Sequence, residues 1–146
     1  MVREIALHEG SLASVAATES DWRRMLARAD VAVLLAFRQG AAIGYASTSR
    51  RLNLWLAGDV VALDDLWVRP EHRNTGAGAR LMHAVADLAD GATIVWGARV
   101  DNVAAHRFYE RLGAVLSTKT VAVWTPQSYR SAAGHLASPQ ARDTSG

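Results

Sequence analysis

The chain has 146 residues, of which 50% are hydrophobic and 21% are charged, as expected for one globular domain with a packed core. Sixteen Lys and Arg against fourteen Asp and Glu give a formal charge of +2, which argues against a dedicated nucleic-acid binder. The absence of cysteine excludes disulfides, Fe–S clusters, thiolate zinc sites and a cysteine nucleophile. The histidines show no metal-ligand spacing, and no segment resembles a secretory signal or a membrane span, so we expect a cytoplasmic protein without a metal site.

The N-terminal segment is expected to hold one strand and one helix. Met1 to Leu7 is predicted to form a short opening strand. A helix is predicted from Glu19 to Arg28, with Thr18 or Ser20 as its N-cap because both side chains carry a hydroxyl acceptor.

A β-hairpin is expected next. Val31 to Phe37 is rich in leucine and valine, and Ala41 to Thr48 resumes the apolar pattern after the turn signal Gln39-Gly40. The alternation continues from Leu52 to Leu56 and is interrupted at Gly58-Asp59. These features predict two antiparallel strands and an extension of the second one.

Val60 to Val68 is predicted to be a buried strand, because it is apolar except for Asp64 and Asp65, and Pro70 prevents its continuation in a central position. A carboxylate in such a strand is costly to bury without a partner. Side chains alternate along a strand, so only one of the two aspartates faces a given side unless a bulge intervenes.

Two helices separated by a strand are predicted in the next segment. Apolar residues on one face predict a helix from Gly76 to Asp90, with Gly91 as a left-handed stop, and Ala92 to Ala98 is predicted to be a strand. Asn102 is a favourable cap for a second helix that ends at Gly113.

Ala114 to Trp124 is expected to supply the last strand or strand pair. After Pro126 the composition changes to Ser, Ala, Gly, Gln and Arg, which predicts one domain over residues 1–125 and an appended tail over residues 126–146. The order of elements predicts an α/β fold around a sheet with mixed strand directions.

The start of the helix predicted at Gly76 has the features of an anion site. Unpaired backbone N–H groups and the helix dipole favour a phosphate there, and Gly76 and Gly78 let it approach the backbone closely. A P-loop is disfavoured because Ala79-Arg80 follows the second glycine, and a dinucleotide fingerprint is disfavoured because Leu81 stands where a third glycine is required.

Two motifs resemble the GNAT superfamily of acetyl-CoA-dependent N-acetyltransferases. Arg73, Gly76 and Gly78 after Val68-Arg69-Pro70 resemble its central signature of Arg or Gln, two residues, Gly, one residue, and Gly or Ala. The second motif is Asn-x-x-Ala-x-x-Phe-Tyr-x-x-x-Gly, which residues 102–113 match in order. Together the matches cover about residues 60–116, and Asn74 departs from the family's usual glycine at a position where asparagine tolerates unusual backbone angles.

The resemblance implies a mostly antiparallel sheet of six or seven strands, flanked by helices and splayed into a V-shaped cofactor cleft. It implies that acetyl-CoA is the cosubstrate, with its pyrophosphate on the backbone amides from Thr75 to Arg80 and its pantetheine arm along Leu66 to Val68. The cofactor-binding residues implied in this way are Leu66, Trp67, Val68, Arg73, Asn74, Thr75, Gly76, Ala77, Gly78, Ala79, Arg80, Asn102, Ala105 and Phe108.

The resemblance also implies catalytic roles. Tyr109 is the candidate acid for the departing thiolate, and a core aromatic is the alternative interpretation. An amine must lose a proton before it attacks, and Asp64 ranks slightly above Asp65 as the base, acting through water, or as an amine anchor. A structural salt bridge is nearly as well supported for either aspartate. Trp67 and Trp96 are weak candidates for an acceptor pocket.

The leading hypothesis is an N-acetyltransferase that acts by direct attack of a primary amine of a small molecule, such as an antibiotic or a polyamine. A peptide N-terminus or a lysine is the competing acceptor, because a shallow groove between strands also suits an extended chain. A CoA-binding module without turnover is the alternative from a different class. The modest net charge argues against an RNA acceptor, and a homodimer is compatible with the sequence.

Overall fold

The computed structural model describes residues 1–136; of the tail predicted over residues 126–146, residues 137–146 lie outside the described part. One four-stranded sheet in the order β1-β2-β3-β4 forms the centre of the molecule. Its strands are β1 (Val31–Arg38), β2 (Ala41–Asn53), β3 (Gly58–Val68) and β4 (Thr93–Val95). The first three are antiparallel, and β4 pairs with β3 in parallel. The fold is therefore mixed α/β, as predicted, with four strands instead of six or seven in the described part of the chain.

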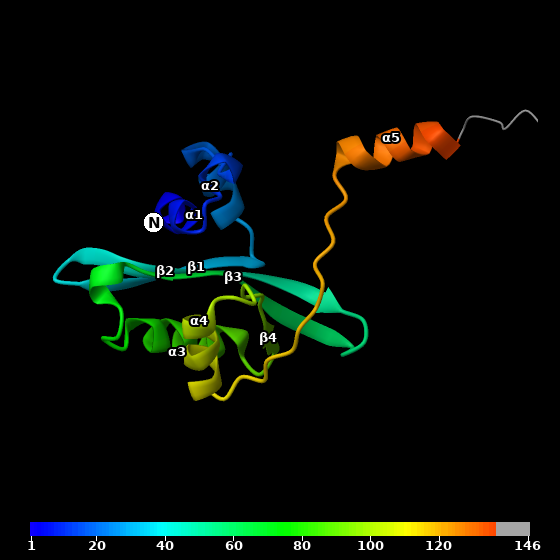
Figure 1. The fold of residues 1–146 in the computed structure, drawn as a ribbon. Helices are drawn as coiled ribbons and strands as arrows, with labels where there is room; N and C mark the ends of the chain where they lie inside the picture. The colour runs from blue at the N-terminus through cyan, green and yellow to red at the C-terminus, as the bar shows by residue number, and fades with distance from the viewer. Residues whose placement is uncertain (137–146) are drawn as a thin grey trace, which may run out of the picture.

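Helices cover both faces of this sheet (Figure 1). On one face lie α1 (Val2–His8) and α2 (Glu19–Leu26), and on the other lie α3 (Ala77–Ala89) and α4 (Val103–Arg111). Short 3-10 helices span Leu12–Ser14 and Pro70–His72. The last helix, α5 (Pro126–Leu136), stands away from the sheet at the end of an extended segment. None of the helices in residues 1–136 is long and apolar enough to cross a membrane.

The N-terminal segment is a helix, so the predicted opening strand is wrong. Ile5 and Ala6 are buried, and Met1, Val2 and Ile5 pack against Tyr45 and Trp67. Contacts spaced by three and four residues place these side chains on one side of a helix, whereas a strand would alternate them between two sides. The sequence from Met1 to Leu7 is too short and too apolar to distinguish the two periods.

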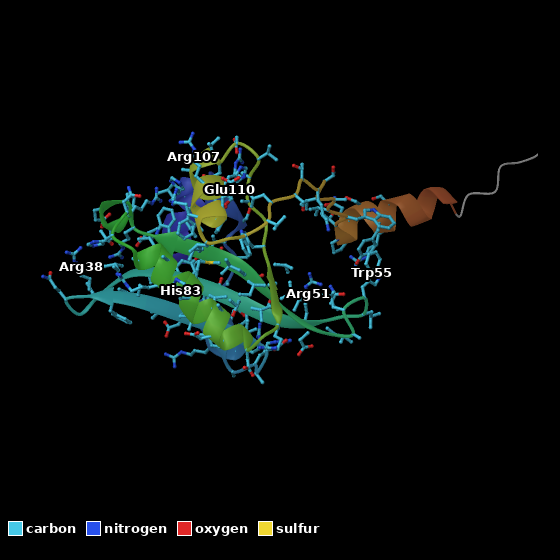
Figure 2. The ribbon with its side chains drawn as sticks, turned by 90° about the horizontal axis from the view of Figure 1, so that it is seen from below. Arg38, Arg51, Trp55, His83, Arg107 and Glu110 are labelled. Atoms are coloured by element: carbon cyan, nitrogen blue, oxygen red, sulfur yellow. The ribbon has the colours of Figure 1, made fainter. Side chains whose placement is uncertain are left out.

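The β1–β2 hairpin is confirmed. Gln39 and Gly40 have φ values of 51° and 78°, and two consecutive positive φ angles are those of the type I′ turn that suits the twist of a hairpin. At the other end, β2 stops at Asn53, because the Asn53 side chain accepts hydrogen bonds from the backbone N–H groups of Trp55 and Leu56 at 3.0 and 3.3 Å. The predicted strand extension to Leu56 is therefore replaced by a turn, and Figure 2 shows Trp55 at its tip.

The helices α3 and α4 follow the prediction closely. Gly76 has φ 82° and precedes α3, whose buried residues Leu81 and Val85 face the sheet. Asn102 caps α4 by accepting a hydrogen bond from the Ala105 N–H at 3.1 Å. After α4, residues 114–125 contain no strand, which corrects the predicted last strand or strand pair. The nearest sheet edge belongs to β4, which has only three residues instead of the seven predicted from Ala92 to Ala98 and offers few backbone partners.

Candidate active site

One cavity of about 620 Å³ brings together α1, the end of β3, the start of α3, and α4. It is lined by Ile5, His8, Glu9, Leu66, Trp67, Val68, Arg73, Asn74, Gly76, Gly78, Ala79, Asn102, Ala104, Ala105, Phe108, Tyr109, Arg111 and Leu112. Both sequence motifs therefore border the same space. Figure 1 shows why, since α4 lies beside α3 on one face of the sheet.

The loop before α3 has the backbone expected for an anion cradle. Asn74 and Gly76 both have positive φ angles, 61° and 82°. The first hydrogen bond of α3 runs from the Arg80 N–H to the Gly76 carbonyl at 3.0 Å, so the preceding first-turn amides are available to a ligand. A Cβ atom on Gly78 would lie 3.4 Å from the Phe108 ring. Gly78 therefore lies directly against the Phe108 ring, where α4 meets the start of α3.

The end of β3 presents an open edge to the cavity. Pairs between β3 and β4 run only from Val60–Thr93 to Ala62–Val95. The Arg69 N–H bonds to the Ile43 carbonyl of the neighbouring chain segment at 2.9 Å, and backbone groups of alternate residues point to opposite edges of an antiparallel strand. Leu66 and Val68 therefore direct their N–H and C=O groups away from β2, and the Val68 carbonyl accepts a hydrogen bond from Arg73 Nε at 3.0 Å.

Most of the predicted cofactor residues line this cavity, but a few do not. Thr75 instead donates from its hydroxyl to the His72 carbonyl at 2.8 Å. Ala77 is buried in the core, and Arg80 is exposed. The V-shaped splay of the cleft stays a prediction.

Tyr109 occupies the inner wall of the cavity. Its side chain is 8% exposed and lies between the rings of Trp96 and Phe108, at centroid distances of 4.9 and 5.2 Å. Burial raises the pKa of Tyr109 above its ordinary value. A phenol with a raised pKa keeps its proton at neutral pH and remains available as a donor.

The two aspartates of β3 lie at a β-bulge. Ser47 pairs with Asp65, and the next residue of β2, Thr48, pairs with Leu63, so Asp64 is the extra residue. Asp64 is exposed, whereas Asp65 is half-buried and accepts a hydrogen bond from the Ser47 hydroxyl at 2.7 Å. Neither aspartate is among the lining residues of the cavity, although Leu66 and Trp67, which follow them directly, are.

The helix α1 closes the cavity on the other face of the sheet, and sequence reasoning missed this contribution. Glu4 accepts two hydrogen bonds from the Arg69 guanidinium, at 3.1 and 3.0 Å, and one from the Trp67 indole at 3.4 Å. The hydrogen bond from Arg69 is the main cause that lowers the pKa of Glu4. No sequence signal separated this helix from a strand, because the segment from Met1 to Leu7 is too short to distinguish the two periods.

The candidate tryptophans differ in position. Trp67 is 6% exposed, lines the cavity and stacks with the guanidinium of Arg73 at 4.7 Å. Trp96 is half-buried and touches Tyr109, but it does not line the cavity. Of the two, only Trp67 is placed to contact a ligand directly.

The fold is similar to that of several solved acetyltransferases. An aminoglycoside acetyltransferase from an uncultured soil metagenomic sample aligns with a TM-score of 0.73 and 18% identity, over 84% of this chain and 86% of that one. The aminoglycoside 6′-N-acetyltransferase AAC(6′)-IG from Acinetobacter haemolyticus aligns with a TM-score of 0.62 and 24% identity, over 74% and 81%. AAC(6′)-Iy, solved in complex with the bisubstrate analogue CoA-S-monomethyl-acetylneamine, aligns with a TM-score of 0.63 and 23% identity, over 71% and 75%.

Family assignment rests on the sequence itself. No curated protein is a significant sequence match to the chain. The model of the acetyltransferase (GNAT) family matches residues 3–114, a range that runs from α1 through α4 and contains every residue that lines the cavity. The protein belongs to the GNAT family of acetyltransferases.

Proposed function

We propose that the protein transfers the acetyl group of acetyl-CoA to a primary amine of a small molecule. The observation that carries this proposal is the single cavity in which the anion cradle before α3, the open edge of β3 and Tyr109 meet. When the pyrophosphate of acetyl-CoA is held at the start of α3, its pantetheine arm runs along β3 toward Tyr109. A cytoplasmic location is part of the same proposal.

Residues of this chain supply the binding interactions for the carrier. The free amides at the start of α3, with the helix dipole, hold the pyrophosphate. The edge groups of Leu66 and Val68 pair with the amides of the pantetheine arm, as a neighbouring strand would. Arg73, fixed by the Val68 carbonyl and the Trp67 ring, adds a positive charge close to the cradle.

The reaction is a direct transfer. The neutral amine attacks the thioester carbon, the new C–N bond forms, and the C–S bond breaks. Tyr109 gives its proton to the departing thiolate, and the proton lost by the amine passes to water or to a carboxylate on the β3 bulge. An acyl-enzyme on a thiol is excluded because the chain has no cysteine.

A small polyamine-like acceptor is favoured over a peptide. The acidic residue Glu9 lines the cavity and suits a cationic acceptor, and Ile5 and His8 of α1 narrow the space that an extended peptide would need. The structural neighbours named above include aminoglycoside acetyltransferases, whose substrates carry several amines. Peptide N-terminal or lysine acetylation is the competing outcome of the test.

The test is a thiol-release assay with acetyl-CoA and a panel of aminoglycosides, polyamines and lysine-containing peptides. Acetylated small amines, identified by mass, would support the proposal, whereas activity confined to peptides would contradict it. Gly76→Trp should weaken acetyl-CoA binding by about tenfold or more, because the indole fills the cradle. The matched control is Gly40→Trp, since Gly40 also has a positive φ (78°) but lies in the β1–β2 turn, away from the cavity.

A further inference from the structure

The cavity reaches both faces of the sheet, and its two halves have different neighbours. Ile5 and His8 line it from the side of α1, whereas Tyr109 lines it from the side of α4, and Figure 1 shows these two helices on opposite faces. Pairing between β3 and β4 ends at Ala62 and Val95, so it does not close the sheet beside the C-terminal end of β3. In the proposed function the carrier binds on the side of α3 and α4, and the acceptor amine is left with the side of α1.

The proton that the amine loses needs an acceptor in the cavity. Asp64 and Asp65 do not line it. The lining residues with ionisable side chains are His8, Glu9, Arg73, Tyr109 and Arg111. Arginine stays protonated in proteins, and Tyr109 is the proposed proton donor. His8 and Glu9 are therefore the two lining residues that can take up the proton.

Of these two, the imidazole is the better proton acceptor. A carboxylate is ordinarily a far weaker base than an imidazole, and histidine is the side chain that most often serves as a general base. Glu9 follows His8 directly and lines the same cavity. Its negative charge attracts a cationic amine toward the imidazole.

The His8 ring is held against the strand that carries the open edge. It packs on the Trp67 indole at 5.1 Å between ring centroids. Trp67 is itself fixed, because its Nε1–H donates to Glu4 Oε2 at 3.4 Å and the Arg73 guanidinium lies 4.7 Å from the centroid of its ring. Trp67 belongs to the stretch of β3 whose edge groups bind the pantetheine arm in the proposed function. The imidazole is therefore next to the path of the thioester.

Both ring nitrogens of His8 are available for proton exchange. Neither forms a hydrogen bond or an ion pair with another residue in the described range 1–136, and the ring makes only the aromatic contact with Trp67. His8 is the last residue of α1, and its side chain is exposed. A proton taken up on the cavity side can therefore pass on to solvent.

We propose that His8 is the general base of the acetyl transfer. As the C–N bond forms, the imidazole takes the proton that the attacking nitrogen loses, directly or through one water. The C–S bond breaks, and Tyr109 protonates the departing thiolate. The imidazolium then gives its proton to solvent and the Tyr109 phenolate regains one, so the protein returns to its starting state. This inference rests on the proposed function and gives it a proton acceptor on α1 in place of a carboxylate on the β3 bulge.

The experiment separates the chemistry of His8 from its packing, in the thiol-release assay with the small amine that the wild type acetylates fastest. His8→Phe keeps a ring against Trp67 and should lower kcat about 100-fold, the contribution expected from one general base, with the Kd for acetyl-CoA within about twofold. Free imidazole should raise the rate of His8→Ala about tenfold and leave that of His8→Phe unchanged, because the phenyl ring fills the space. The matched control is His83→Phe, since His83 is exposed on α3 and does not line the cavity.

A second readout needs no turnover. The NMR signal of the His8 imidazole, assigned by its absence in His8→Phe, should shift when 1,5-diaminopentane is added to the protein with CoA, and the signal of His83 should not.

The outcomes distinguish this inference from the proposed function. A normal kcat in His8→Phe would overturn the role of His8 and leave the proposed function intact, as would a lost rate in His8→Ala that imidazole does not restore. Absence of transfer from the wild type to every small amine would contradict the proposed function. In that case a shift of the His8 signal alone would support its contact with the amine, and an unshifted signal would overturn the inference as well.

Discussion

Tyr109 combines burial with access to the cavity, and this combination suits a proton donor. Burial raises its pKa, so the phenol stays protonated up to pH values above the ordinary tyrosine pKa of about 10. The aromatic neighbours Trp96 and Phe108 hold the ring in place. The side chain therefore packs in the core and, in the proposed mechanism, also donates a proton in the cavity.

Tyr109→Phe should lower kcat about 100-fold, the contribution expected from one general acid, and leave the Kd for acetyl-CoA within about twofold. The ring remains, so packing is kept and only the proton is lost. Because the pKa of Tyr109 is raised, Tyr109 should stay protonated up to a pH of about 10. The wild-type rate should therefore fall through loss of this proton donor only above that pH. Steady-state rates over pH and calorimetry with acetyl-CoA give the measurements.

Tyr129→Phe is the matched control, because Tyr129 lies on α5 and is 40% exposed. It should leave both kcat and Kd unchanged. An unaltered kcat in Tyr109→Phe would show that the proton comes from elsewhere. A weakened Kd with normal kcat would assign Tyr109 to binding instead.

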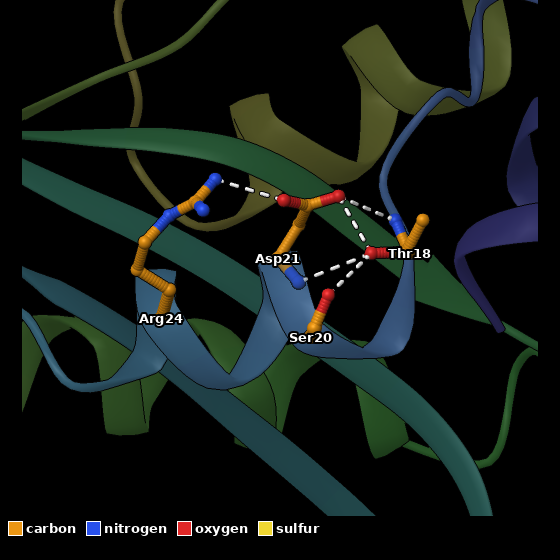
Figure 3. Close-up of polar contacts among 4 residues, drawn as sticks. All are labelled: Thr18, Ser20, Asp21 and Arg24. Atoms are coloured by element: carbon orange, nitrogen blue, oxygen red, sulfur yellow. Dashed lines mark hydrogen bonds and ion pairs between the residues drawn. The ribbon is translucent and has the colours of Figure 1, made fainter.

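At the scale of an element, the start of α2 shows how local signals determine a helix (Figure 3). The Thr18 hydroxyl accepts a hydrogen bond from the Asp21 N–H at 3.2 Å, and Asp21 Oδ2 accepts one from the Thr18 N–H at 2.9 Å. This reciprocal pair is a capping box. Arg24 adds an ion pair to Asp21 at 2.8 Å, and the hydrogen bond from Thr18 is the main cause that lowers the pKa of Asp21.

Thr18→Ala should lower the free energy of unfolding by about 1 kcal/mol, because the Asp21 N–H loses its acceptor. Acetyl-CoA affinity should not change, since α2 contributes no lining residue to the cavity. Chemical denaturation of both proteins measures the difference. Ser20→Ala, which removes only the contact of its hydroxyl with Thr18, should stay within about 0.5 kcal/mol of the wild type, and an equal loss would contradict the capping assignment.

The elements that the sequence predicts well are those with complete local signals. The turn at Gln39-Gly40, the cap at Asn102 and the apolar face of α3 each need only nearby residues. The misassigned segments depend on distant partners. The helix α1 is identified by packing on Tyr45 and Trp67, and residues 114–125 alternate like a strand but lack a sheet edge long enough to pair with.

At the scale of the whole molecule, the site is assembled from three parts of the chain that meet around one strand end. Residues 66–79 and 102–112 carry recognisable motifs, so this half of the site was predicted from the sequence. Ile5, His8 and Glu9 carry no motif, and α1 is held over the end of β3 by the ion pair of Glu4 with Arg69 and by the packing of Ile5 on Tyr45 and Trp67. The bulge at Asp64 was also unpredictable, since it depends on the register between β2 and β3.

The separation of α5 from the sheet makes the predicted boundary after residue 125 testable. Val121, Val123 and Trp124 are exposed in the segment that leads to it, and none of residues 126–131 lines the cavity. Its Tyr129 instead packs against Trp124 at 5.8 Å between ring centroids. Residues 126–131 thus contribute neither to the core nor to the lining of the cavity.

A chain that ends at Thr125 should keep the acetyl-CoA Kd within about twofold and the melting temperature within about 2 °C of the full chain, because residues 126–131 are exposed and such a segment contributes little to the free energy of unfolding. Calorimetry and thermal denaturation over a range of protein concentrations test both values. A large drop in melting temperature that depends on concentration would mean that the tail stabilises an assembly of copies, and a drop independent of concentration would place it in the domain. Either result would contradict a domain boundary after residue 125. The exposed apolar residues before α5 would then be covered, by the domain itself or by another copy of the chain.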